Sequence, residues 1–270
     1  MKIAAFYENM TEGARHDGVS MAQVLVRFRE AGLEKICISG ESWIRDRKEL
    51  QPILKDLDLG IEGFHCPVRF PENPDTEEYR TLIRLAVEAG AGNILLVPGF
   101  LTGGNTIRDL EAMCDGMRKA VEFGKQEGIP VLMEDYDGFL APYNCIAGLK
   151  YFMDAVPEMG CAFDTGNFTI FHEDELEAFE LFKGRIVTVH LKDRTKQPCH
   201  PGNKPLLCAD HKNAYVCPVG SGDIRIREIL QRLEQRDYPG NVIAELFGAD
   251  PAFMLEDIET SVRFLRAELN

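Results

Sequence analysis

Four ionisable side chains each stand at the end of one of the last four short β-rich runs of the chain. They are Glu134, Asp164, His190 and Glu245. Because burying a carboxylate without a partner costs several kcal/mol, a carboxylate in such a position is expected to face a functional site. Three carboxylates and one imidazole form a mostly oxygen ligand set that suits Mn²⁺, Mg²⁺ or Co²⁺ better than Zn²⁺. We therefore predict that these residues bind one divalent metal ion, preferably Mn²⁺, and leave positions open for substrate oxygens.

Eight β-rich runs recur along the whole chain, and segments with the apolar spacing of amphipathic helices lie between them. The runs are nearly continuous in apolar residues, which is typical of parallel strands covered on both faces. They comprise Ile3–Tyr7, Lys35–Ile38, Ile61–His65, Asn93–Val97, Val131–Glu134, Cys161–Asp164, Ile186–Leu191 and Val242–Leu246. The helical spacing is clearest over Met21–Phe28, Leu50–Leu57, Leu82–Val87, Ile107–Gly124, Tyr143–Val156, Leu176–Phe182, Ile226–Gln235 and Phe253–Leu265.

This alternation predicts either a closed barrel or an open, doubly wound sheet. The length of 270 residues suits eight strand–helix units, which typically need about 250 residues. An open sheet usually carries a glycine-rich phosphate loop after its first strand, and Phe6-Tyr7-Glu8-Asn9 is not such a loop. We predict one (β/α)8 TIM barrel domain over residues 1–270. Neighbouring strand ends then lie about 4.8 Å apart, so the four residues can converge over the barrel axis.

One segment breaks the alternation after the seventh predicted strand. Residues 195–223 contain four prolines, and a loop of this length in a compact domain is usually functional. Its position predicts a lid over the active-site mouth. The segment also contains potential zinc ligands, but they lack the paired C-x-x-C spacing of structural zinc sites, so we interpret them as ordinary loop residues. These are Cys199, His200, Cys208, His211 and Cys217.

Five short motifs, in their order and spacing, resemble the xylose isomerase-like superfamily of sugar phosphate isomerases and epimerases. The motifs are Val131–Glu134, Phe163–Asn167, Val189–Asp193, Val219–Ile224 and Ile243–Glu245. The superfamily also includes ketose 3-epimerases, hydroxypyruvate isomerase, inosose dehydratase and endonuclease IV. The resemblance spans essentially the whole chain and implies a TIM barrel, but its motifs are not specific for one substrate.

The resemblance also implies a role for each of the four residues. Glu134 and Glu245 would bind the metal and act as an acid–base pair, while Asp164 and His190 would mainly be ligands. A metal chelated by a carbonyl and the adjacent hydroxyl stabilises the enediolate that forms when a base removes the neighbouring proton. We therefore predict a metal-dependent isomerase or epimerase of a small sugar, keto-polyol or hydroxy-carbonyl compound.

Weaker candidates lie at or beyond other strand ends. The predicted substrate contacts are His65, Lys192, Arg194 and Tyr7, although each could equally be structural. Glu41 and Asp193 accompany them at the barrel rim, where a network of charges is the simpler interpretation. Phe100, like Tyr7, could form an apolar wall or belong to the core.

One position departs from the pattern of many metal-binding relatives, which place a histidine three residues after the aspartate. Here that position is Asn167, and the nearest histidine on the same loop is His172. An amide is a poor substitute for imidazole as a metal ligand. The departure therefore disfavours a multinuclear site and the endonuclease branch.

Three alternatives remain beside an isomerase or epimerase. A lyase of the inosose dehydratase type would use the same site and expel a β-hydroxyl from the enediolate. A phosphodiesterase like endonuclease IV needs two or three metals and a basic groove, which the net charge of −14 opposes. A non-catalytic subunit would be expected to lose one of the four ligands, and none is lost.

The composition predicts a cytoplasmic protein with a small-molecule partner. The first residues lack the apolar run of a signal peptide, and no later run reaches the roughly 18 apolar residues of a membrane span. The eight scattered cysteines indicate reduced thiols rather than a disulfide framework. The strongly acidic charge disfavours nucleic acid as a partner. The resemblance further implies a tendency to form homo-oligomers.

Overall fold

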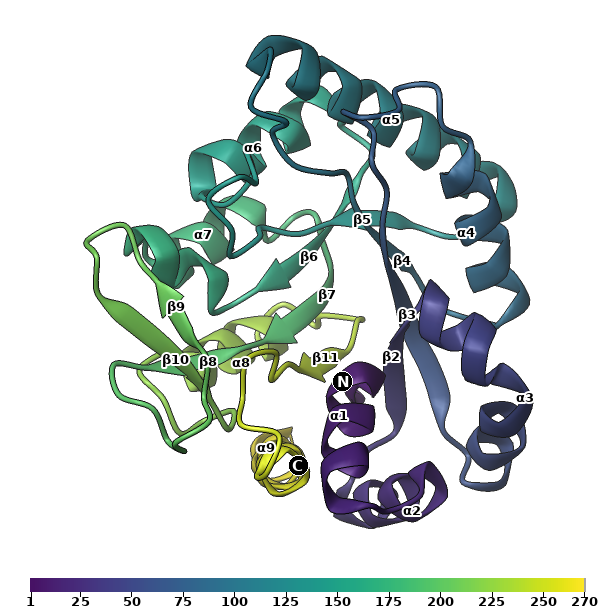
Figure 1. The fold of residues 1–270 in the computed structure, drawn as a ribbon, viewed down its shortest axis with the longest axis vertical. Helices are drawn as coiled ribbons and strands as arrows, with labels where there is room; N and C mark the ends of the chain where they lie inside the picture. Colours follow the sequence, from purple (N-terminus) through teal and green to yellow (C-terminus); the bar gives the residue numbers. More distant parts are fainter. Residues whose placement is uncertain (270) are drawn as a thin grey trace.

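The barrel predicted from the sequence is confirmed. In the computed structural model, which describes residues 1–269, eight parallel strands close into a barrel in the order β1-β11-β7-β6-β5-β4-β3-β2 (Figure 1). Each predicted β-rich run forms one of them, within a few residues at either end. The strands are β1 (Ile3–Phe6), β2 (Lys35–Ser39), β3 (Gly60–Pro67), β4 (Ile94–Val97), β5 (Val131–Met133), β6 (Gly160–Asp164), β7 (Ile186–Leu191) and β11 (Val242–Ala244).

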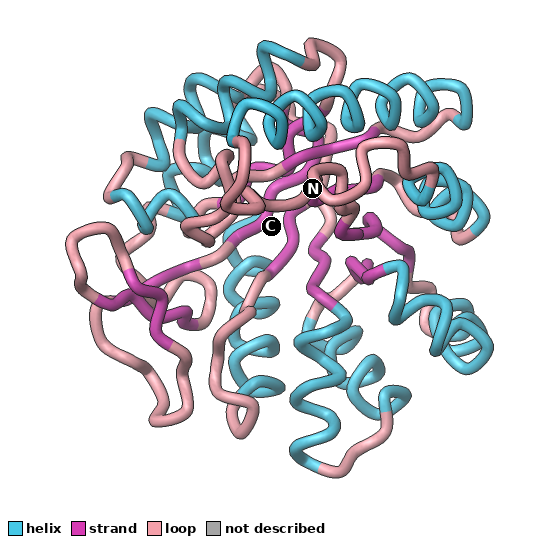
Figure 2. The backbone as a smooth tube through the Cα atoms, turned by 45° about the horizontal axis from the view of Figure 1, so that its top comes forward, coloured by secondary structure: helices cyan, strands magenta, loops and turns pink. Residues whose placement is uncertain are grey.

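Helices surround the barrel as an outer ring (Figures 1 and 2). They are α1 (Tyr7–Asp17), α2 (Met21–Ala31), α3 (Gly40–Asp56), α4 (Glu78–Glu88), α5 (Thr106–Glu127), α6 (Ile146–Ala155), the 3-10 helix η1 (Asn167–Phe171), α7 (Glu175–Phe182), α8 (Ile226–Glu234) and α9 (Met254–Leu269). Within residues 1–269, none of them is both long and apolar enough to pass through a lipid bilayer.

The sequence does not predict α1, which follows β1 directly. The helix lacks a strong apolar stripe, because its buried face includes the small or polar residues Asn9, Gly13 and Ala14. Gly13 allows α9 to approach so closely that a Cβ atom there would lie 2.8 Å from the side chain of Leu255. Close packing on α9, a contact between the two ends of the chain, therefore positions this helix.

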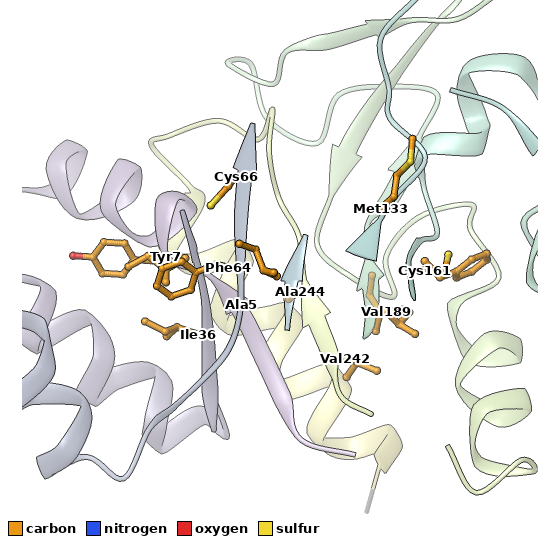
Figure 3. Close-up of a cluster of buried hydrophobic side chains, with 14 of the residues drawn as sticks. Ala5, Tyr7, Ile36, Phe64, Cys66, Met133, Cys161, Val189, Val242 and Ala244 are labelled. Carbon is orange, nitrogen blue, oxygen red and sulfur yellow. The ribbon is translucent and has the colours of Figure 1, made fainter. Parts of the chain in front are cut away.

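Alternate residues of each strand face opposite sides of the barrel wall. One side packs against the helices in the main core, and Figure 3 labels Ala5, Ile36, Phe64, Met133 and Val189 among these buried side chains. The other side forms two smaller clusters inside the barrel. These inner clusters are Ala4, Phe6, Cys37 and Ile243, and Leu95, Leu132 and Ala162.

The predicted metal ligands lie on the inward-facing side of the barrel wall, like the residues of the two inner clusters. They lie two residues beyond inner apolar residues, in the pairs Leu132 and Glu134, Ala162 and Asp164, and Ile243 and Glu245. His190 on β7 is in register with Asp164 on β6 and with Ile243 on β11. Because the strand repeat is two residues, all four side chains point into the mouth of the barrel.

The segment 195–223, expected as an irregular loop, contains strands of its own. β8 (Asp193–Thr195), β10 (Asn213–Cys217) and β9 (Pro205–Leu207) form an antiparallel sheet in that order. Figures 1 and 2 both draw this sheet outside the ring of barrel strands. Two of its strands have only three residues and the segment is rich in proline, so the local pattern gives little β signal. A lid role for the segment stays a prediction.

Asp193 joins the start of this segment to its end. Its buried carboxylate accepts backbone hydrogen bonds at Oδ1 from Arg194 (2.8 Å) and Ile224 (3.2 Å). At Oδ2 it accepts from Gly220 and Gly222, both at 2.9 Å. This contact joins the motif Val189–Asp193 to the motif Val219–Ile224. It also holds the end of β7, from which His190 projects.

We expect Asp193→Asn to lower the free energy of unfolding. One side-chain oxygen becomes an amide nitrogen that cannot accept, so two buried N–H donors lose their acceptor, at a cost of at least about 2 kcal/mol. Urea denaturation would measure the change. Asp223→Asn, at an exposed position in the same segment, is the control, and equal losses in the two variants would contradict a clamping role for Asp193.

Candidate metal centre

The structure brings the four predicted ligands together at the carboxyl ends of four neighbouring barrel strands. One oxygen or nitrogen from each of Glu134, Asp164, His190 and Glu245 lies within 4.8 Å of the corresponding atoms of the other three. Asp164 and His190 are buried, at 0% and 1% exposure, and Glu245 is 5% exposed. The arrangement is a compact, nearly closed group of three carboxylates and one imidazole.

Several of these polar atoms have no hydrogen-bond partner among residues 1–269. His190 Nδ1 lies 2.9 Å from Glu134 Oε2 and 3.2 Å from Glu245 Oε2, but it forms an aligned hydrogen bond with neither, and Asp164 Oδ2 is also unpaired. Buried polar atoms are nearly always hydrogen-bonded. Unpaired oxygens and a nitrogen that face one point are what a divalent cation requires, so the residues present fit a metal.

The other oxygen of Asp164 is used to shape the loop after β6. Asp164 Oδ1 accepts from the backbone N–H groups of Gly166 (2.7 Å) and Asn167 (2.8 Å), which leaves Oδ2 for the cluster. Asn167, at the position where many relatives have histidine, donates from Nδ2 to the Asp135 carbonyl and accepts at Oδ1 from Lys192 at 2.8 Å. Asn167 therefore positions a lysine and does not serve as a fifth ligand.

Lys192 places a buried ammonium beside the cluster. Its side chain is 3% exposed, and Nζ lies 2.5 Å from Glu245 Oε1 and 3.6 Å from Asp164 Oδ2. Burying like charges together is unfavourable unless opposite charge compensates them. Three carboxylates and one ammonium leave two negative charges, which a divalent cation would neutralise. The net charge of the site and its unpaired polar atoms thus both indicate that the residues fit a divalent metal ion.

The carboxylates and the imidazole change one another's proton affinity. Burial alone would lower the pKa of His190, but Glu134 and Glu245 outweigh it and raise that pKa to about 10. Burial raises the pKa of Asp164 to about 7, although Lys192 opposes the shift. For Glu245, burial is outweighed by Lys192 and His190, so its pKa is lowered. Without a metal, the imidazole of His190 is therefore in its positively charged, doubly protonated form at neutral pH.

Two aspartates that the sequence does not single out belong to the same region. Asp137, in the loop after β5, lies 2.7 Å from the Arg194 guanidinium and 3.5 Å from Lys192 Nζ. Asp135 is fully buried, and neither of its carboxylate oxygens has a hydrogen-bond partner among the described residues. Burial, followed by Asp164 and Glu134, raises the pKa of Asp135 well above its usual value. The acidic run that begins at Glu134 was the available signal.

The weaker candidates separate into two groups. Lys192 lies in the cluster, and Arg194 lies next to it, where its guanidinium donates to the Gly166 carbonyl at 2.9 Å. Tyr7 packs in the outer core and donates its hydroxyl to Asp46, away from the cluster. Phe6, one residue earlier, faces inward and contacts the His190 ring edge-on at 5.2 Å. We therefore replace Tyr7 by Phe6 as the aromatic wall of the site.

The remaining candidates lie outside the cluster. Glu41 is exposed on the first turn of α3. Phe100 packs against the main core and contacts Tyr136 at 5.3 Å. His65 pairs with Glu8, a residue that the sequence does not single out.

The potential zinc ligands of the segment 195–223 are not gathered into a metal site in the part of the chain that the structure describes. Cys199 is exposed, while Cys208 and Cys217 are buried. His200 stacks on Phe253 at 3.9 Å and pairs with Asp257. Cys217 ends strand β10 rather than lying in a loop.

Comparison with known proteins identifies one family. The family model described as a xylose isomerase-like TIM barrel matches residues 18–268. Among curated proteins, the inosose dehydratase of Clostridium perfringens is 26% identical over 147 residues, which is 53% of this chain and 48% of that enzyme. The match thus spans about half the length of this relative.

Solved structures share the fold at low sequence identity. The probable 3-DHS dehydratase AsbF of Bacillus anthracis, involved in petrobactin synthesis, superposes with a TM-score of 0.76 at 18% identity, over 98% of this chain and 99% of its own. The IOLI protein with a bound zinc atom also gives a TM-score of 0.76, at 15% identity, over 100% of this chain and 98% of its own. These likenesses show that the barrel is common to all three chains.

We expect the chelator-treated protein to bind one Mn²⁺ per chain, by elemental analysis and isothermal titration calorimetry. Asp164→Asn should weaken binding by more than about 100-fold, because removing even an outer-shell partner typically costs 10- to 100-fold. Asp257→Asn is the matched control, since Asp257 is another buried aspartate. Equal Mn²⁺ affinity in the two variants would contradict the ligand assignment.

Metal binding should release protons. A metal needs the neutral imidazole of His190 and the ionised carboxylate of Asp164, and their pKa values are raised to about 10 and about 7. We expect about one to two protons to leave at pH 7, so apparent affinity falls as pH falls, by about tenfold per pH unit for each displaced proton. Calorimetry in two buffers of different ionisation enthalpy counts the protons. Binding without proton release would contradict the protonation of His190.

Proposed function

The chain belongs to the xylose isomerase-like TIM barrel family, and from that premise we propose that it is a divalent-metal-dependent isomerase or epimerase. The substrate class is a small sugar, keto-polyol or hydroxy-carbonyl compound. One observation carries this proposal, the group of ligand atoms from Glu134, Asp164, His190 and Glu245 within 4.8 Å of one another. Mn²⁺ is the metal that we propose, with Mg²⁺, Co²⁺ or Zn²⁺ as alternatives.

The two glutamates are the acid–base pair of the proposed reaction. A bound divalent cation would act as a Lewis acid that stabilises negative charge on a carbonyl oxygen. Glu134 follows β5 and Glu245 follows β11, and β6 and β7 lie between these strands in the barrel. A substrate held above the cluster would therefore have one glutamate on either side. Removal of a proton by one and its return by the other inverts a carbon, and return to the neighbouring carbon moves the carbonyl.

Lys192 forms an ion pair with only one of the two glutamates. Its ammonium contacts Glu245 at 2.5 Å and lowers the pKa of that carboxylate, whereas no described ion pair joins Glu134 to a lysine or arginine. Glu134 is therefore the carboxylate that we assign to the first proton abstraction. Lys192 and Arg194, both buried, are the groups that we assign to orienting substrate oxygens, directly or through the residues that they hold.

A dehydratase is the second candidate, and the similarity to inosose dehydratase over half of the chain favours it. Both reactions begin with removal of a proton next to a carbonyl. In a dehydration the β-hydroxyl then leaves as water, and nothing returns to the carbon. The two candidates therefore differ in whether the site holds a proton donor for a leaving hydroxyl.

The number of metal ions separates the proposed function from that of a phosphodiesterase. Within residues 1–269 the structure gathers one group of potential metal ligands, whereas a phosphodiesterase of the endonuclease IV type needs two or three metals. A cytoplasmic location, a homo-oligomer, and the absence of nucleic-acid and membrane partners stay predictions.

A panel of ketoses, inososes and hydroxypyruvate, incubated with the Mn²⁺-loaded protein in D₂O, tests the proposal by NMR. We expect solvent deuterium to enter a C–H position next to the carbonyl of at least one compound. An isomerised or epimerised product would identify the first candidate, and an unsaturated product the second. Absence of both exchange and product in every compound, with metal bound, would refute proton abstraction as the function.

We expect Glu134→Gln and Glu245→Gln each to retain measurable Mn²⁺ but to lose about 10² to 10⁴-fold in turnover, the range for removing a general base. The amide keeps one oxygen ligand but cannot accept a proton. One of the two glutamates returns the proton to the substrate, and the variant that lacks only this glutamate should still exchange the substrate hydrogen with D₂O. Glu62→Gln, at a buried glutamate that pairs with Lys35 near the strand starts, is the control. Turnover at the wild-type rate in either site variant would contradict the two-base assignment.

A further inference from the structure

A second histidine–carboxylate pair stands at the mouth of the barrel, in the half that contributes no metal ligand. His65 lies on β3 and Glu8 on the first turn of α1, directly after β1. His65 is in register with Ser39 on β2 and with Leu95 on β4, and Leu95 belongs to an inner cluster. The side chain of His65 is therefore on the inner side of the wall, across the mouth from the strands that carry the metal ligands.

The contacts of this pair hold Glu8 and leave one ring nitrogen of His65 available. Glu8 Oε2 lies 2.9 Å from His65 Nε2, and Glu8 Oε1 accepts from the Ser39 backbone N–H at 2.9 Å. Among the described residues, no hydrogen bond is made by His65 Nδ1, and the two side chains are 21% and 22% exposed. Burial would raise the pKa of Glu8, but the contacts with His65 and Ser39 together outweigh burial and lower that pKa to about 2.

Phe6 connects this pair with the metal cluster. The Phe6 ring contacts the His65 ring and the His190 ring, each edge-on at 5.2 Å between centroids. Phe247, just beyond Glu245 in the chain, contacts Phe6 at 5.0 Å and His65 at 6.2 Å. One phenyl ring therefore separates the two imidazoles, and both border the same apolar surface. A small polyhydroxylated substrate bound at the cluster and lying on Phe6 would extend its hydroxyl groups towards His65.

The two proton donors of the cluster, His190 and Lys192, each face carboxylates of the cluster itself. His190 Nδ1 faces two carboxylates, and Lys192 Nζ is shared between Glu245 and Asn167. A dehydration needs a group that gives a proton to the departing hydroxyl, because hydroxide is a poor leaving group. Among the residues described above, His65 is the one that combines a position at the mouth, a carboxylate partner and a free ring nitrogen.

We propose that Glu8 and His65 form a second acid–base pair, in which His65 protonates the β-hydroxyl that leaves during dehydration of a polyhydroxylated ketone. This inference rests on the second candidate of the proposed function, the dehydratase, and assigns the proton donor that a leaving hydroxyl needs. A glutamate of the cluster takes the proton next to the carbonyl, and the electron pair of that C–H bond forms the new C–C double bond. The C–O bond breaks with its electrons on oxygen, which takes a proton from His65 Nδ1 and leaves as water.

After the step, His65 is neutral and the glutamate is protonated. A proton passes from the glutamate to solvent and another from solvent to His65, so the net reaction is loss of one water molecule from the substrate. Glu8 stabilises the positive charge of the imidazolium before the step and fixes which ring nitrogen faces the substrate. Glu8 is thus a positioning residue, and His65 is the catalytic one.

The test measures two rates in the Mn²⁺-loaded protein with an inosose as the probe. The first is exchange of the hydrogen next to the carbonyl with D₂O, and the second is formation of the unsaturated product. We expect His65→Asn to exchange at the wild-type rate while product formation falls about 10² to 10⁴-fold, the range for a lost general acid. Product formation should fall less in Glu8→Gln than in His65→Asn. In the double variant it should fall no further than in His65→Asn, because the two residues act as a unit.

His16→Asn is the matched control. His16 also lies 2.9 Å from a carboxylate, that of Asp17, but on the exposed end of α1, so both rates should stay at the wild-type value. If His65→Asn lowers exchange and product equally, or lowers neither, the acid role is overturned while the proposed function stands. If the wild type returns an isomer or epimer and no unsaturated product, the acid role is likewise overturned. If the wild type shows neither exchange nor product, the proposed function fails and this inference fails with it.

Discussion

Mutual repulsion among three buried carboxylates is the interaction on which the rest of this site depends. Two like charges about 4 Å apart repel by about 4 kcal/mol at the effective dielectric of a protein near its surface. Glu134, Asp164 and Glu245 are held at such distances at the barrel mouth. The structure offsets part of this repulsion with the ammonium of Lys192 and, in the absence of metal, with a proton on His190. A divalent cation would replace the proton and complete the compensation.

The barrel supplies the rigidity that such an arrangement needs. Each ligand projects from a parallel strand or from the residue directly after one, and the strands are tied to neighbours on both sides. The loops are held by further carboxylates, since Asp164 Oδ1 orders the turn after β6 and Asp193 fixes both ends of the segment after β7. Packing and backbone hydrogen bonds, rather than the ligands themselves, therefore keep the charges together. The same geometry leaves the opposite half of the mouth, with Phe6 and the Glu8–His65 pair, for the substrate.

The parts of the structure that could be predicted from the sequence are those with a local pattern. Apolar runs gave all eight barrel strands, and the two-residue repeat within them places Asp164 and Glu245 on the inner face. α1 could not be predicted in this way, because its packing on α9 depends on Gly13 and on residues more than 200 positions away. The Glu8–His65 pair spans 57 residues and the Asp137–Arg194 pair also spans 57, so the local pattern does not show which residues pair. Tyr7 was placed in the site although the strand repeat directs its neighbour Phe6 inward.

The most direct test of the account is the position of bound metal. Crystals of the protein soaked in Mn²⁺ and measured at the manganese absorption edge would locate the ion by its anomalous scattering. The account predicts one peak per chain among Glu134, Asp164, His190 and Glu245, with Lys192 still beside Glu245. A peak elsewhere, with these four side chains turned away from one another, would contradict it.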